Sequence, residues 1–153
     1  MALIRSPEVR DIARIMVIEE ECFESPWTLS SFYVLLRHHG RIKDKDGEIR
    51  MSIIELERKV TGYIVWEYDS KKKEGHVLNI AIKREKQRRG HGAQLMNYVL
   101  DTLENMGAKS SFLEVRESNL SARRFYETFG MVPVDRVEGY YGNEDAIVYR
   151  KEF

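Results

Sequence analysis

One stretch of this chain, a strand-like run followed by a basic turn, a long helix and a second strand, constrains its fold more than any other. Residues 76–82 are mostly apolar and strand-like, and the apolar residues of 91–106 recur at helical spacing until Gly107 ends the helix. Residues 111–115 then form a second strand-like run. Because a helix that joins two strands returns the chain in the same direction, the sequence predicts a parallel pair of strands in one sheet.

Short runs separated by turns predict that the rest of the sheet is mostly antiparallel. The runs 49–56, 60–68 and 76–82 are close enough in sequence to form a meander. Further elements are expected as follows: strands at 2–5, 132–137 and 146–149, a first helix with Val9, Ile12, Ala13, Met16 and Phe23 on its apolar face, short helices around 32–36 and 120–129, and a polar loop at 39–48. We therefore expect one domain, residues 1–153, with an α/β (α+β) fold in which helices cover both faces of a mixed sheet.

The composition of the chain excludes several classes of protein. Its 153 residues include 25 basic and 25 acidic ones, and this zero net charge argues against direct binding of nucleic acid through a basic surface. No apolar run approaches the roughly 20 residues that cross a bilayer, and no secretory signal is visible in residues 1–10. The single cysteine, Cys22, forms no disulfide within the chain. We expect a cytoplasmic protein that binds no membrane.

The turn between strand 76–82 and the long helix has the chemistry of an anion site. Five of the seven residues 83–89 are basic, and Gly90 and Gly92 open the helix without bulky side chains. Because helix N-termini present unpaired N–H groups and a partial positive charge, this turn suits a pyrophosphate. An ordinary strand-to-helix turn with solvated charges explains the same spacing. The pattern is not a nucleotide P-loop, and it matches the dinucleotide-binding fingerprint only weakly.

Several motifs in chain order resemble those of the GNAT acyltransferases. Gln87-Arg88-Arg89-Gly90-His91-Gly92 is similar to the family's Gln/Arg-x-x-Gly-x-Gly/Ala signature, and Asn79-Ile80-Ala81-Ile82 resembles the Asn-Ile-Ala-Val that precedes it in RimI-type members. Residues 113–119 and 122–130 resemble the family's Leu-Glu-Val-Arg-x-Ser-Asn and Ala…Leu-Tyr…Gly-Phe block, and 140–146 resembles the substrate loop of Ard-type catalytic subunits. The resemblance covers most of the chain and points to the RimI/Ard-type protein N-terminal acetyltransferases.

The resemblance implies an acetyl-CoA site, without a metal, where two parallel strands splay apart. Those strands would be 76–82 and 111–116, and a backbone N–H near Ile82 would hold the thioester oxygen. The pyrophosphate would sit on the N–H groups at the start of the helix. The implied cofactor residues are, in chain order, Ile80, Ala81, Ile82, Gln87, Arg88, Arg89, Gly90, His91, Gly92, Ala93, Asn119, Ser121, Arg124 and Tyr126, with Arg123 as an alternative to Arg124.

The chemistry that the resemblance implies is direct transfer of acetyl to a neutral amine in a ternary complex. One proton must leave the ammonium, and one must reach the departing thiolate. Tyr126 matches the family's general acid, since a phenol with a pKa near about 10 is protonated at neutral pH. Glu114 matches the base of RimI-type enzymes and His76 that of Ard-type enzymes, each acting directly or through a water. The structural alternatives are a core tyrosine, an ion pair of Glu114 with Arg116 or a nearby lysine, and a strand-edge histidine.

The expected acceptor is the α-amino group of a protein N-terminus. Its pKa is near about 8, against about 10.4 for lysine, so presenting a neutral lysine at pH 7 costs roughly 3 kcal/mol more. The resemblance assigns the substrate walls to Tyr140 and Tyr141 and to a helix–helix turn with Phe23, Glu24 and Trp27. A protein lysine, a small-molecule amine and an acyl-CoA-binding domain without turnover are the alternatives. Whether an auxiliary ribosome-docking subunit exists is left open.

Overall fold

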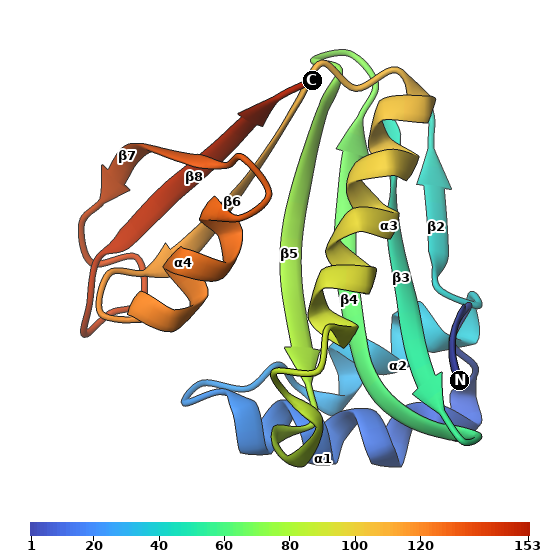
Figure 1. Cartoon of the computed structure of the whole chain (residues 1–153). Helices are drawn as coiled ribbons and strands as arrows, with labels where there is room; N and C mark the ends of the chain where they lie inside the picture. The colour runs from blue at the N-terminus through green and yellow to red at the C-terminus, as the bar shows by residue number, and fades with distance from the viewer.

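The computed structural model describes all residues 1–153 and consists of one eight-stranded sheet with helices on both faces (Figure 1). The strand order is β1-β3-β4-β5-β6-β8-β7, and β2 pairs with β3 beside this path. The elements are β1 (Ala2–Arg5), the 3₁₀ turn η1 (Val9–Asp11), α1 (Ile12–Cys22), α2 (Leu29–Arg37), β2 (Arg41–Asp44), β3 (Gly47–Leu56), β4 (Lys59–Asp69), β5 (Glu74–Ile82), the 3₁₀ turn η2 (Arg84–Lys86), α3 (His91–Met106), β6 (Ser110–Arg116), α4 (Leu120–Glu127), β7 (Val132–Val137) and β8 (Ala146–Glu152).

Strands β5 and β6 are the parallel pair that the sequence predicts. They pair only over Glu74–His76 and Ser110–Phe112, and then they separate (Figure 1). All other pairings are antiparallel. Helix α3 connects β5 to β6, and its apolar stripe is buried in the core that covers the sheet. The β6, α4, β7 and β8 part of the chain is therefore joined to the rest of the sheet along a short seam.

Two apolar cores on opposite faces of the sheet hold the helices in place. On one face, α1 and α2 bury Ile15, Phe32 and Leu36 against side chains of β3, β4 and β5. On the other face, α3 and α4 pack with Trp66 and Tyr149, which are fully buried. The predicted fold class is confirmed, since burial on both faces makes the sheet a central layer. None of the helices is long and apolar enough to cross a membrane.

Residues 41–44 form strand β2, where the sequence predicts a polar loop. The strand lies against β3, with Arg41 opposite Arg50 and Asp44 opposite Gly47. Its side chains are largely exposed, because it is a short strand with a partner on one side only. A strand without a buried face shows no alternation of apolar residues, so the sequence pattern could not reveal it.

The buried face of α1 also differs from the predicted one. Ile15, Ile18 and Glu19 are the buried residues of this helix, whereas Val9 lies outside it in η1 and Ala13 is exposed. Ile12, Met16 and Phe23 of the predicted face do pack against the core, but the prediction counted apolar residues only and therefore omitted Glu19. The carboxyl group of Glu19 instead points into the protein, where several donors bind it.

Candidate active site

A cleft opens where β5 and β6 separate. Its cavity of about 250 Å³ is lined by both strands, by the α1–α2 turn and by α4. Beyond His76, the edge of β5 that faces β6 has no strand partner. The β4–β5 ladder also shifts register between Val65 and Trp66, which leaves Leu78 as an extra residue of β5. Apart from the Ile82 carbonyl, the backbone of the segment around Ile80–Ile82 therefore has no strand partner on the side of the cleft, as the predicted cofactor contact requires.

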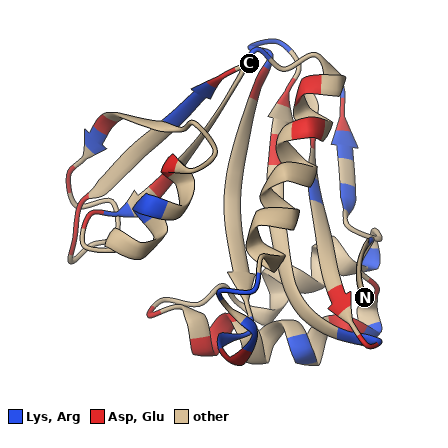
Figure 2. Ribbon diagram, in the orientation of Figure 1, with Lys and Arg blue, Asp and Glu red and all other residues tan.

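The β5–α3 turn presents a row of free backbone donors. The N–H groups of six successive residues, Arg88 through Ala93, have no hydrogen-bond partner in the chain. Gly90 caps the helix with φ of 87°, and a Cβ there would meet nothing within 4 Å, so the space in front of the turn is open. Lys and Arg residues make up most of this turn, which is largely blue in Figure 2. A phosphate group fits this combination of free N–H groups, helix dipole and positive charge.

The end of β5 is fixed by side chains from two directions. The Gln87 amide donates to the Ile82 carbonyl at 3.0 Å, and the Cys22 thiol lies 3.3 Å from the same oxygen. Burial raises the pKa of the Cys22 thiol above its ordinary value. Cys22 is half-buried and its thiol stays protonated, which makes it a poor nucleophile, so its contact with the strand end is the role that the structure supports.

Helix α4 forms the other side of the predicted cofactor site. Asn119 lines the cleft and caps the helix, with its Oδ1 accepting from the Ala122 N–H at 3.1 Å. Arg123 is already bound, because its guanidinium donates to the Tyr149 hydroxyl at 3.1 Å and to the Glu117 carbonyl at 3.0 Å. Ser121 and Arg124 are exposed. Of the two adjacent arginines, Arg124 is therefore the one free to meet a phosphate.

His76 and Glu114 form a hydrogen-bonded pair between β5 and β6. The imidazole Nε2 lies 2.7 Å from Glu114 Oε1, and the ring stacks on Phe112 with centroids 4.0 Å apart. Burial lowers the pKa of His76, but its hydrogen bonds to Glu114 and Glu67 outweigh this effect and raise it above the ordinary 6.5. The alternative in which Glu114 pairs with Arg116 is wrong. The two candidate bases are thus parts of one unit.

Tyr126 lies in the cleft as a buried phenol. It is 9% exposed, its ring packs against Phe125, and its hydroxyl makes no hydrogen bond within the chain. Burial and the nearby Tyr141 raise the pKa of Tyr126 well above its ordinary value. The phenol therefore stays protonated at neutral pH and has a proton to donate. Tyr126 belongs to the apolar core on this face of the sheet, and its hydroxyl is left without a partner at the cleft.

The predicted substrate walls come together at the mouth of the cleft. Phe23, Glu24, Trp27 and Tyr141 line the cavity. Tyr140 does not line it, but its ring stacks on Tyr141 and its hydroxyl donates to Glu114 at 3.5 Å. Burial raises the pKa of Tyr141 to about 12, and that of Tyr140 also rises. Both phenols are therefore neutral, and they form an aromatic surface beside Glu114.

Arg116 connects these two walls. Its guanidinium lies 3.8 Å from Glu24 of the α1–α2 turn and stacks over the Tyr141 ring at 4.4 Å. It also donates to Asn143 at 3.0 Å and lies 3.4 Å from Glu144. Glu144 in turn accepts from the Ser118 N–H at 2.6 Å. The loop that carries the two tyrosines is therefore held to β6 by these contacts.

Glu19 is a residue of the cleft that the sequence analysis missed. Its side chain is buried and lines the cavity, where Oε1 accepts from the Tyr63 hydroxyl at 2.6 Å and the Asn79 amide at 2.8 Å. Oε2 accepts from the Trp27 N–H at 2.8 Å. The signal was its position, since it follows Ile15 by four residues and Ile18 by one on the buried face of α1. No group of three or more His, Cys, Asp or Glu side chains could hold a metal ion.

The cleft between separated parallel strands, with a carboxylate–imidazole pair, a buried phenol and free N–H donors around it, defines an N-acetyltransferase. The comparisons with known proteins agree. The chain belongs to the acetyltransferase (GNAT) family, whose family model matches residues 12–131. The predicted family and the predicted class of enzyme are confirmed.

Individual relatives and solved structures show which members of the family this chain is similar to. The ribosomal protein bS18-alanine N-acetyltransferase of Haemophilus influenzae is 31% identical, over 97% of this chain and 97% of its own. The crystal structure of the Escherichia coli ribosomal-protein-S18-alanine N-acetyltransferase superimposes with a TM-score of 0.81 at 26% identity, covering 99% of this chain and 94% of that one. Ard1 from Thermoplasma volcanium (TM-score 0.85, 24% identity, 99% and 97% covered) and Arabidopsis thaliana NAA60 with acetyl-CoA (0.81, 17%, 100% and 99%) share the fold.

Proposed function

We propose that this protein transfers an acetyl group from acetyl-CoA to the α-amino group of a protein N-terminus. The observation that carries the proposal is that Glu114 and Tyr126 line one cleft between β5 and β6. Acetylation of an amine needs a base for the ammonium proton and an acid for the leaving thiolate. A carboxylate and a protonated phenol that share one cavity meet both needs.

The residues around the cleft fit acetyl-CoA, which supplies the activated acetyl thioester when it is bound. The free N–H groups of Arg88 through Ala93 would bind its pyrophosphate, with Arg124 as a further cation. The unpaired edge of β5 near Ile80–Ile82 would pair with the amide groups of the pantetheine arm. The predicted cofactor residues lie at the end of β5, on the turn and helix start that follow it, and on or next to α4, and this placement supports the proposal.

The proton steps use groups of the chain alone. Glu114, with His76 bound to its Oε1, would take a proton from the substrate ammonium, so that an N–H bond breaks and an O–H bond forms. Tyr126 would give its phenolic proton to the sulfur that leaves. Tyr126 is 9% exposed and the Glu114 side chain 16%, so both groups are partly withdrawn from solvent, which strengthens both interactions. The proton that Glu114 gains and the proton that Tyr126 loses are later exchanged with solvent.

The choice of a protein N-terminus rests on the acceptor chemistry and on the relatives. The pKa of an α-amine is roughly two units lower than that of a lysine, so removing its proton costs less free energy. The Haemophilus influenzae relative carries a name that specifies alanine of ribosomal protein bS18. Phe23, Trp27 and Tyr141 form an aromatic entry to the cleft that suits the first residues of a peptide.

The experiment that tests the proposal measures CoA release with acetyl-CoA and a panel of peptides with different first residues. Each peptide is paired with a control in which the α-amine is blocked and a lysine is left free. We expect turnover on free N-termini that disappears on blocking. Turnover that persists on blocked peptides would assign the enzyme to lysines, and turnover on polyamines alone would assign it to small amines.

A further inference from the structure

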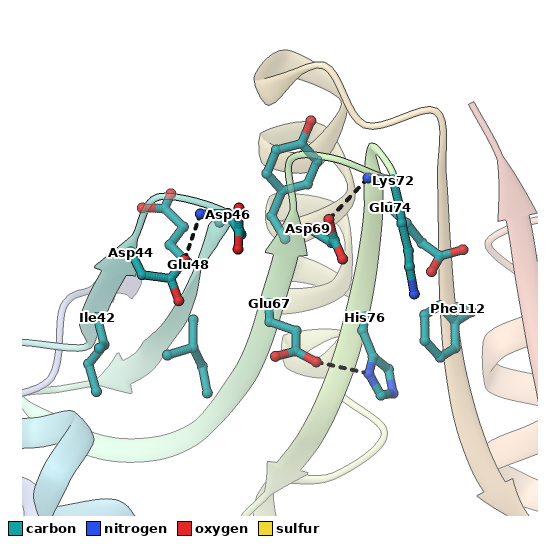
Figure 3. Close-up of a pocket in the computed structure, with 13 residues that line it drawn as sticks. Ile42, Asp44, Asp46, Glu48, Glu67, Asp69, Lys72, Glu74, His76 and Phe112 are labelled. Atoms are coloured by element: carbon teal, nitrogen blue, oxygen red, sulfur yellow. Dashed lines mark hydrogen bonds and ion pairs between the residues drawn. The ribbon is translucent and has the colours of Figure 1, made fainter.

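His76 has a carboxylate at each of its two ring nitrogens. Nε2 lies 2.7 Å from Glu114 of β6, and Nδ1 lies 3.2 Å from Oε1 of Glu67 on β4. The antiparallel register places Glu67 directly opposite His76, so the second contact is set by strand pairing (Figure 3). Phe112 stacks on the ring and limits its rotation. The imidazole is therefore held at three points.

The two contacts determine how many protons the imidazole ring carries. An ionised carboxylate only accepts hydrogen bonds, whereas a neutral imidazole has one N–H to donate. Two carboxylates on the two nitrogens are both satisfied only when the ring carries both protons. The raised pKa of His76 agrees with this geometry. The imidazolium donates to Glu114 Oε1, and Glu114 Oε2 has no hydrogen-bond partner in the chain.

We propose that Glu67 is a positioning residue of the active site, which holds His76 doubly protonated against Glu114 and so leaves Glu114 Oε2 as the atom that accepts the amine proton. This inference rests on the proposed function. It assigns separate roles to the two candidate bases: Glu114 accepts the proton, and His76 orients it. Glu67 acts through His76 and does not touch the substrate.

The charged groups in contact with His76 lie on the two strands beside it, β4 and β6. Glu67 and Glu114 are in direct contact, and Tyr140 reaches His76 only through Glu114. His76 also borders a cavity of about 340 Å³, which Glu114 does not line (Figure 3). The charged residues that line this cavity are Asp44, Asp46, Glu48, Glu67, Asp69, Lys72 and Glu74; Glu48 is paired with Arg41 and Arg50, and Glu74 with Arg150.

The test is the pH dependence of kcat/KM in Glu67→Gln, measured on a peptide that the wild-type enzyme acetylates. Loss of the negative charge at Nδ1 lowers the pKa values of the His76–Glu114 pair. We expect the acid limb of the profile to move to lower pH, by on the order of one unit. We also expect kcat to fall severalfold because the pair is a weaker and less well oriented base. Glu67→Asp keeps the charge and should restore part of both effects.

Asp69→Asn is the matched control. Asp69 lies on the same strand and lines the same cavity, but it binds the N–H groups of Lys71 and Lys72 and does not touch His76. A general field effect of the cavity would move the acid limb in both variants. The contact that we propose moves it only in Glu67→Gln. Equal shifts in the two variants would overturn the inference, as would an unshifted profile in Glu67→Gln.

A second measurement separates this inference from the proposed function. The ¹⁵N shifts of His76 in a pH titration report how many protons the ring carries, and they need no turnover. We expect both nitrogens to be protonated near neutral pH in the wild type, and the titration to move to lower pH in Glu67→Gln. A neutral ring in the wild type would overturn the inference even in an active enzyme. An enzyme inactive on every peptide, with the expected titration, would refute the function alone.

Discussion

The carboxyl group of Glu19 accepts a hydrogen bond from the hydroxyl of Tyr63 at 2.6 Å, and this contact joins α1 to the middle of the sheet. The same side chain holds the Trp27 N–H and the Asn79 amide. Burial and Glu19 raise the pKa of Tyr63 far above its ordinary value, so the phenol remains the donor. The α1–α2 turn that borders the substrate entry is therefore anchored from within the core.

The substitution Glu19→Gln should destabilise the protein and impair peptide binding together. The NH₂ of the introduced amide would face another donor, which leaves a buried group unsatisfied at a cost of about 1–3 kcal/mol. We expect a lower melting temperature and a higher KM for peptide, because Trp27 loses its anchor. Thermal unfolding and peptide kinetics check both. Glu20→Gln, one residue on and exposed, is the control and should change neither.

Tyr126→Phe should remove catalysis and leave the fold intact. The hydroxyl has no partner in the chain, so its loss leaves no polar group unsatisfied. We expect kcat to fall by about 100-fold or more, the usual contribution of a general acid. CoA binding by calorimetry and the melting temperature should stay as in the wild type. An unchanged kcat would exclude the phenol from the proton step.

His76 and Glu114 should behave as one unit in a double-mutant cycle. Each of His76→Asn and Glu114→Gln breaks the same 2.7 Å hydrogen bond. We expect each single variant to lower kcat by about 100-fold, and the double variant to lower it little further. The cycle is read from steady-state rates on one peptide. Effects that multiply would show that the two groups act independently.

The neighbouring arginines of α4 should have separate effects. Arg124 is exposed, so Arg124→Gln should raise the KM for acetyl-CoA roughly threefold, less at high salt, and leave stability unchanged. Arg123 is bound to Tyr149 and to the Glu117 carbonyl. We expect Arg123→Gln to lower stability by about 1 kcal/mol and to leave the KM unchanged. A raised KM in Arg123→Gln together with a loss of stability in Arg124→Gln would instead show that Arg123 contacts the cofactor.

Protonation of His76 should stabilise the fold at low pH. Its folded-state pKa is raised above 6.5, so the contribution is fully present below pH 6.5 and disappears as the pH rises through the folded-state value. We expect His76→Asn to lower the melting temperature more at pH 6 than at pH 9. A constant difference between the two proteins would show that the ring contributes through its stacking on Phe112 alone.

Local periodicity and motif spacing were enough to predict much of this fold. The strand–turn–helix–strand unit of 76–115 shows alternation and helical spacing over long runs, and the structure has β5, α3 and β6 there. Strand β2 escaped prediction because an edge strand with exposed side chains has no apolar alternation. Glu19 escaped because acidity was read as exposure, although three donors compensate the buried carboxylate.

The site could be predicted residue by residue but not as a set of contacts. Alternation along β6 placed Glu114 and Arg116 on one face, and it could not say which of them meets His76, 38 residues earlier in the chain. That choice depends on the parallel register, which pairs His76 with Phe112. The contact of Glu67 depends on the antiparallel register with β4 in the same way. Register between distant strands is set by the packed cores, and no local pattern encodes it.

The six free N–H groups at the start of α3 have a consequence for regulation by metabolism. They would hold the pyrophosphate, a part of acetyl-CoA that the reaction leaves unchanged. Under the proposed function, spent CoA would keep these contacts and would compete for the same cleft. The rate of such an enzyme would follow the ratio of acetyl-CoA to CoA more closely than the concentration of either one.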